Sequence, residues 1–189
     1  IASFSTEQIQ ALTPSQIGYL NSRQVTALGT EHLASLSPES VAAISTRAIS
    51  GLTAEQVSSL STEQFAALTP SQIGSMRPFQ FEAMTPSQAA SMDSAQLGKL
   101  SATNMRSLTT DAVAALSADQ IAAINPGAFR GLGEEQIAVL ATDRIEALTT
   151  SQLGRISPLQ LAFFSTDQLA ALSPQQISSL DPRAMVRLA

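Results

Sequence analysis

The sequence predicts an all-α fold, an α-solenoid (superhelix) of very short helices with one helix in each eight-residue repeat. Three observations predict it: an unbroken eight-residue period, a helix start signal in each repeat, and two large apolar positions per repeat on one helix face. Short repeats cannot bury an apolar face alone, so they stack and bury it against their neighbours. These observations therefore favour a quasi-one-dimensional array over a globular domain.

The repeat runs without insertion or deletion from Ser5 to Leu188. We label its positions a to h, with position a at Ser5 and position h at Leu12. Position h is large and apolar in all 23 octads, and position e in 22 of them, with Ala89 as the exception. We therefore expect residues 1–189 to form a single continuous array with 23 octads over 5–188. Residues 1–4 match the second half of an octad, and this leads us to expect an excerpt of a longer array.

Positions a to d carry the signals of a helix N-terminus. Position a is Ser, Thr, Asn or Asp, the preferred N-caps, in 19 octads. All nine prolines are at position b, the first helical position, where no backbone N–H is needed. Ten of the fifteen acidic residues are at position c, where the helix dipole favours negative charge. Gln at position d, present in 15 octads, completes a capping box with the cap. Every octad is thus predicted to begin a new helix.

Positions e and h lie three residues apart and therefore share one helix face. A helix of five or six residues is unstable alone in water, so neighbouring octads must bury this face. One continuous helix is excluded, because nine internal prolines would each cost about 3 kcal/mol. A β-solenoid is the remaining alternative. We disfavour it because the apolar spacing alternates three and five rather than two, and Ala, Gln and Leu are poor strand formers.

An 80-residue super-repeat lies over the octad. Gly18 and Gly98, Gly51 and Gly131, and Gly74 and Gly154 are each ten octads apart. Two interpretations stay open at this point. A ten-octad segment was duplicated, or ten octads fit a whole number of superhelical turns, so that one face recurs on the same side of a rod. The handedness and the number of octads per turn do not follow from the sequence.

Phe79, Leu159 and Phe163 are the candidate contact residues. Phe79 and Leu159 place large side chains at the normally polar position c, ten octads apart, and Phe163 lies near the second of them. One interpretation is a local change in core packing, in which Phe81 fills space left by Ala89. The other is an exposed apolar patch that contacts another rod or a partner.

Composition and motifs argue against catalysis, nucleic-acid binding and membrane insertion. The chain has no cysteine, one histidine and a net charge of −5 with ten Lys and Arg residues, so no thiolate metal site or phosphate-tracking surface is expected. His32 is interpreted as a capping-box substitute, and Glu134 and Glu135 as first-turn residues that complement the helix dipole. The longest apolar run, residues 161–164, is far shorter than a membrane span. We expect no enzyme activity and no cofactor.

The octad phrase Leu-Ser/Thr-x-x-Gln-Ile/Val-x-Ala-Leu resembles the octapeptide-repeat arrays of very large secreted bacterial proteins, labelled adhesin-like or haem-utilisation exoproteins. The resemblance covers essentially the whole chain and implies an extracellular or cell-surface location. It supplies no haem ligands. The expected function is a rod or stalk in an exported protein. The alternatives are a protein- or glycan-binding solenoid and a self-assembling surface filament subunit. Expected partners are neighbouring repeats of the same chain, further copies of it, or a cell-surface molecule.

Overall fold

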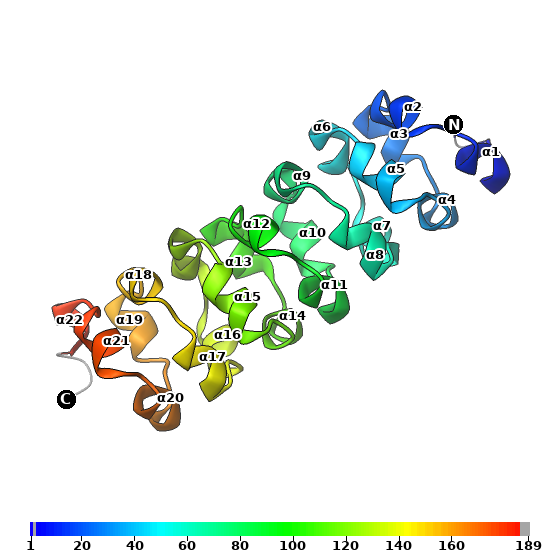
Figure 1. Ribbon diagram of the computed structural model, residues 1–189. Helices are drawn as coiled ribbons and strands as arrows, with labels where there is room; N and C mark the ends of the chain where they lie inside the picture. Colours follow the sequence, from blue (N-terminus) through cyan, green and yellow to red (C-terminus); the bar gives the residue numbers. More distant parts are fainter. Residues whose placement is uncertain (2, 186–189) are drawn as a thin grey trace.

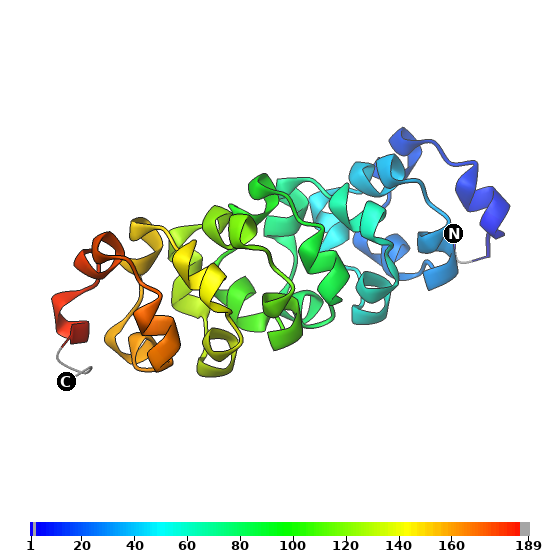
Figure 2. The same ribbon diagram turned by 60° about the horizontal axis from the view of Figure 1, so that its bottom comes forward.

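The computed structural model describes residues 1 and 3–185 and shows an elongated rod of short helices (Figure 1). No strand occurs within these described residues. A view turned by 60° shows the same succession of turns along one axis (Figure 2). Each octad forms one helix, which confirms the predicted α-solenoid.

The helices, in chain order, are α1 (Thr6–Gln10), α2 (Pro14–Gly18), α3 (Ser22–Thr26), α4 (Thr30–Ala34), α5 (Pro38–Ala43), α6 (Thr46–Ile49), α7 (Ala54–Ser59), α8 (Thr62–Ala66), α9 (Pro70–Ser75), α10 (Pro78–Glu82), α11 (Pro86–Ala90), α12 (Ser94–Leu97), α13 (Ala102–Ser107), α14 (Thr110–Ala114), α15 (Ala118–Ala123), η1 (Pro126–Gly131), α16 (Glu134–Ala138), α17 (Thr142–Glu146), α18 (Thr150–Leu153), α19 (Pro158–Leu161), α20 (Thr166–Ala170), α21 (Pro174–Ser178) and α22 (Pro182–Met185).

The predicted capping boxes form as expected. In α9, Thr69 Oγ1 accepts a hydrogen bond from the N–H of Gln72 at 3.2 Å, and Gln72 Oε1 accepts one from the N–H of Thr69 at 2.6 Å. Where the cap has no suitable side chain, the second half of the box persists, as in the 2.7 Å bond from the N–H of Arg77 to Gln80 Oε1. The extended backbone of each cap residue ends one helix and begins the next.

Positions e and h form one continuous apolar core along the rod. Ile73 at position e is completely buried, and Met76 at position h of the same octad is 5% exposed. Phe81 and Ala89, at successive e positions, are both completely buried in this core. The predicted assignment of both columns to the core is therefore confirmed, except near the two ends of the rod, where Leu12, Leu20 and Leu169 are partly buried and Ile177 is 42% exposed.

One octad departs from the α-helical pattern. Residues Pro126–Gly131 form a 3-10 helix, η1. Asn125 Oδ1 accepts a hydrogen bond from the N–H of Gly127, two residues on, rather than from the third residue. Ala at position d does not by itself cause this change, because Ala48 and Ala112 occupy the same position in the α-helices α6 and α14. The bond from Gly127 to Asn125 accompanies the tighter first turn.

The glutamine at position d also joins successive turns of the superhelix, a role that the sequence analysis did not anticipate. Gln80 Nε2 donates to the carbonyl oxygens of Ile49 at 2.8 Å and Leu52 at 2.9 Å. These acceptors are positions e and h of the octad four units earlier. The same side-chain amide bonds to the preceding turn at Gln56, Gln64, Gln72, Gln80, Gln88, Gln96, Gln120, Gln136, Gln152, Gln160, Gln168 and Gln176.

Three glutamines test this rule, because no turn precedes them in the structure. Gln8, Gln16 and Gln24 are exposed and take part only in capping within their own octads. Gln56, four octads after Gln24, reaches the preceding turn and is buried. The burial of a position-d glutamine therefore depends on the turn beneath it.

The spacing of contacts sets the superhelical repeat. Helices three octads apart pack together, as α10 does with α7 and α13. Hydrogen bonds between adjacent turns join Thr26 Oγ1 to the carbonyl of Gly51, 25 residues along the chain, and Gln80 Nε2 to that of Leu52, 28 residues along it. A turn of about 27 residues satisfies both contacts, so ten octads complete about three turns.

The 80-residue super-repeat therefore matches the superhelix, as the second interpretation of it required. In Figure 1, α4, α8, α11, α14, α17 and α20 lie along one edge of the rod. Residues ten octads apart, such as those that open α8 and α17, recur on this edge after three turns.

The first prediction concerns the glutamine that joins the turns. A carboxylate suits a capping box but repels backbone carbonyls, so Gln80→Glu should destabilise the rod by about 3 kcal/mol or more. Gln16→Glu, which keeps the cap and faces no preceding turn, should cost less than about 0.5 kcal/mol. Urea unfolding at neutral pH measures both. Acidification should restore part of the loss at position 80, because a protonated carboxyl can donate. Equal effects of the two substitutions would contradict this role.

The second prediction concerns close approach between turns. A Cβ added at Gly131 would overlap the carbonyl oxygen of Ala102, whereas one at Gly74 would meet Lys99 Cβ at an ordinary 3.7 Å. Gly131→Ala should therefore destabilise the rod by about 1–3 kcal/mol. Gly74→Ala, inside α9, should stabilise it by up to about 1 kcal/mol. Thermal melts of the two variants should shift in opposite directions.

Candidate functional site

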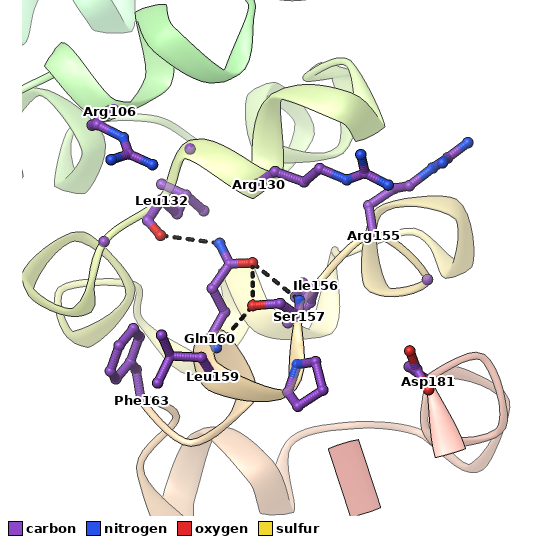
Figure 3. Close-up of a pocket in the computed structure, with 14 residues that line it drawn as sticks. Arg106, Arg130, Leu132, Arg155, Ile156, Ser157, Leu159, Gln160, Phe163 and Asp181 are labelled. Carbon is purple, nitrogen blue, oxygen red and sulfur yellow. Dashed lines mark hydrogen bonds between the residues drawn. The ribbon is translucent and has the colours of Figure 1, made fainter. Parts of the chain in front are cut away.

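Three arginines from successive turns line an open groove of about 610 Å³ on the surface of the rod. Arg106 comes from α13, Arg130 from η1, and Arg155 follows α18 (Figure 3). All three side chains are exposed. Gly131, which permits close approach between turns, and Gly154 also line this groove.

Leu159 and Phe163 form the apolar wall of the same groove, and in Figure 3 their side chains lie together on one side of Gln160. Leu159 is 56% exposed, whereas Phe163 is half-buried and packs against the core. Phe79 is 40% exposed but does not line this groove. The structure therefore brings two of the three candidate contact residues together and places the third about three turns away.

The groove is a positively charged site on a negatively charged chain. Asp181 is its one acidic lining residue. Within residues 1 and 3–185 the one ion pair joins Arg144 to Asp143, at 3.0 Å, so the three groove arginines have no acidic partner within ion-pair distance among these residues. Gln160 lies on the floor of the groove, and its Nε2 already donates a hydrogen bond of 3.0 Å to the carbonyl oxygen of Leu132. The groove thus offers guanidinium groups beside an apolar wall.

A smaller groove of about 420 Å³ occupies the equivalent position one super-repeat earlier. It contains Gly51, ten octads before Gly131, and Thr26, ten octads before Arg106. Arg23 and Arg77 supply its positive charge. An arginine-lined groove therefore occurs at equivalent places in the two super-repeats, although the arginines of the two grooves occupy different octad positions.

Carboxylates in the first turns are held in their charged form. Glu39 and Glu63 accept hydrogen bonds from their own backbone N–H groups and from the cap hydroxyls of Ser37 and Ser61, which lowers the pKa of both. For Glu7 the hydroxyl of Ser5, at 2.7 Å, is the larger cause of a lowered pKa. These exposed carboxylates therefore stay ionised at pH values below the usual titration range of a glutamate side chain.

The remaining candidates for chemistry have structural roles. His32 Nδ1 accepts a hydrogen bond from the N–H of Gly29 at 3.3 Å, which confirms the predicted capping-box substitution. Glu134 and Glu135 lie in the first turn of α16, as predicted. Among the residues whose placement is described, no three His, Cys, Asp or Glu side chains gather as metal ligands. In that same part of the chain, no helix has the length and apolar character to span a membrane.

The groove arginines were not singled out from the sequence, although a signal was present. Arg106 and Arg130 are three octads apart, and Arg155 follows after three octads and one more position, so each step is close to one superhelical turn. The three arginines occupy different octad positions, however, so the eight-residue register hides their alignment. The spacing gains its meaning only once the length of a turn is known.

The third prediction separates the apolar wall from the core. Leu159→Ser should change the unfolding free energy by less than about 0.5 kcal/mol, because the side chain is largely exposed. Leu161→Ser, two residues later at a completely buried position, should cost about 3 kcal/mol or more. Thermal unfolding of the two variants measures the difference. A comparable loss in both would show that the groove wall is part of the core.

Comparison with known proteins places the array in a family. A search of curated proteins finds no significant match. The family model of the ALTTAQ repeat matches residues 1–38, 38–70, 89–126 and 145–182, which together exceed half of the chain. The chain, a helical repeat array, belongs to the ALTTAQ repeat family.

Proposed function

We propose that this array is a non-enzymatic structural segment, a rod or stalk in an exported bacterial surface protein. The observation that carries the proposal is the regular bonding of each turn to the one before it. Twelve position-d glutamines repeat this bond from Gln56 to Gln176. An array built this way lengthens by adding identical units, which is the property that a stalk requires.

The core supports the same proposal. Buried e and h side chains continue from octad to octad in a single cluster, without a boundary between domains. Because each octad contacts only the turns next to it, the cross-section stays constant as the chain lengthens. The cell-surface location rests on the resemblance to octad arrays of secreted proteins, and antibody labelling of intact bacterial cells tests it.

A binding solenoid is the second candidate function. The groove that joins Arg106, Arg130 and Arg155 to Leu159 favours it, since an exposed apolar side chain beside guanidinium groups suits an acidic protein partner. In this alternative the rod is a scaffold, and the partner binds the edge of the rod that carries the groove.

The fourth prediction tests the rod. A second copy of residues 85–164, inserted after Phe164, adds ten octads in register. Small-angle scattering should show an unchanged cross-sectional radius and a rod about 30 Å longer, since three turns stack at about 10 Å each. The unmodified chain should scatter as an extended particle. A compact globule, or a wider cross-section after the insertion, would refute the proposal.

A further inference from the structure

Acidic residues form a row along one edge of the rod. Glu31, Glu63, Asp111, Asp143 and Asp167 occupy position c of α4, α8, α14, α17 and α20. In Figure 1 these five helices lie along one edge. Glu7 of α1 extends the row, and from there to Asp167 it covers twenty octads in six turns, or about 27 residues per turn, with one turn skipped at α11, where Ser87 occupies position c. We call these six residues the acidic row.

Arginines form a second row with the same spacing. It comprises Arg23, Arg47, Arg77, Arg106, Arg130 and Arg155. Successive members are three to four octads apart, one per superhelical turn. The elements that carry or flank them stack in two sets: α3 on α6, and α10 on α13, η1 and α18 in succession. We call these six residues the arginine row.

The two rows follow different sides of the rod. In Figure 1, α6 and α18 lie along the edge opposite to α8, α14 and α17. The one cation within a helix of the acidic edge is Arg144, and it is used internally: its Nε donates to the carbonyl of Leu116 at 2.7 Å and its Nη1 pairs with Asp143. The acidic edge therefore keeps a net negative charge.

Both rows are available to a partner. All twelve side chains are exposed. Asp143, in its pair with Arg144, is the one row member in an ion pair within the described ranges. Hydrogen bonds lower the pKa of Glu7 and Glu63, so these members of the acidic row stay charged to a lower pH than an ordinary glutamate.

We propose that two copies of this rod associate side by side, with the acidic row of one against the arginine row of the other. The proposal rests on the proposed rod. The charges are complementary, and both rows follow a turn of about 27 residues, so one alignment brings opposite charges together at every turn except that of α11, where Ser87 stands in place of an acidic residue. A single exposed pair contributes little, but a register of five pairs accumulates. Leu159 and Phe163 add apolar contact within the arginine row.

This contact is heterologous, because each rod offers two different surfaces. After one contact forms, each rod still has a free row of the opposite sign. Association therefore continues into sheets or bundles rather than stopping at a dimer.

The fifth prediction tests the acidic row with matched variants. Glu63→Lys/Asp111→Lys reverses two charges in the row. Glu39→Lys/Asp119→Lys makes the same change of net charge at the same octad position in α5 and α15, outside both rows. Sedimentation at low ionic strength should show self-association of the unmodified chain, lost at high salt. The row variant should associate at least about tenfold more weakly, and the control should not.

A mixing experiment keeps the test independent of folding. Arg106→Glu/Arg130→Glu should also fail to self-associate, yet a mixture with Glu63→Lys/Asp111→Lys should associate, because each variant supplies the charge that the other lacks. An unmodified chain that stays monomeric at every ionic strength would overturn the proposal, even if its arginine row binds polyphosphate. So would a mixture that does not associate. If scattering shows the expected extended rod but the rod stays monomeric, the lateral association is refuted while the proposed rod function stands.

Discussion

The side-chain amide at position d is the interaction on which the rest of the structure depends. A helix of five residues leaves most of its backbone N–H and C=O groups without internal partners. The amide oxygen satisfies an N–H at the cap of its own helix, and the amide nitrogen satisfies carbonyls of the preceding turn. In Gln80 these three bonds measure 2.7, 2.8 and 2.9 Å. One residue thus solves the problem of both helix ends, and among the described residues no buried side-chain polar atom lacks a partner.

Exceptions at position d show what the interaction requires. Arg144 replaces the glutamine, and its Nε donates to the carbonyl of Leu116, at the usual distance of 28 residues along the chain. Asn104 has a shorter side chain and keeps the capping half, with Oδ1 accepting from the N–H of Ser101 at 2.8 Å. At Ala48, Ala112 and Ala128 both halves are absent; the first two octads stay α-helical, and the third forms the 3-10 helix η1. A donor that reaches the preceding turn is therefore favoured, while vacancies, including the consecutive pair Asn104 and Ala112, are tolerated because other octads still join the turns.

Local chemistry made the helices, caps and core predictable, since Thr69, Gln72 and Ile73 act within one octad. The turn-to-turn bond was missed because Gln fits a capping box equally well with or without it. A signal existed: Glu fits the same box, yet none of the 23 octads has an acidic residue at position d, although ten have one at position c. The groove and the rows were not predictable for another reason. They depend on the length of a superhelical turn, a long-range quantity that no single octad encodes.

The length of a superhelical turn determines which octad positions hold the array together and which positions form its exposed surface. Positions d, e and h meet the adjacent turns and the core, so a change there alters the fold. Most of the arginine row comes from positions c, f and g, as Arg47, Arg106 and Arg155 illustrate. Positions c and f mostly face solvent and can vary without breaking the position-d bonds. Position g varies only where the turns leave room, as the close contact at Gly131 shows. Because three turns take about ten octads, substitutions three or four octads apart accumulate on one edge of the rod. A low-complexity repeat can thus acquire an acidic and a basic edge while its internal structure stays the same.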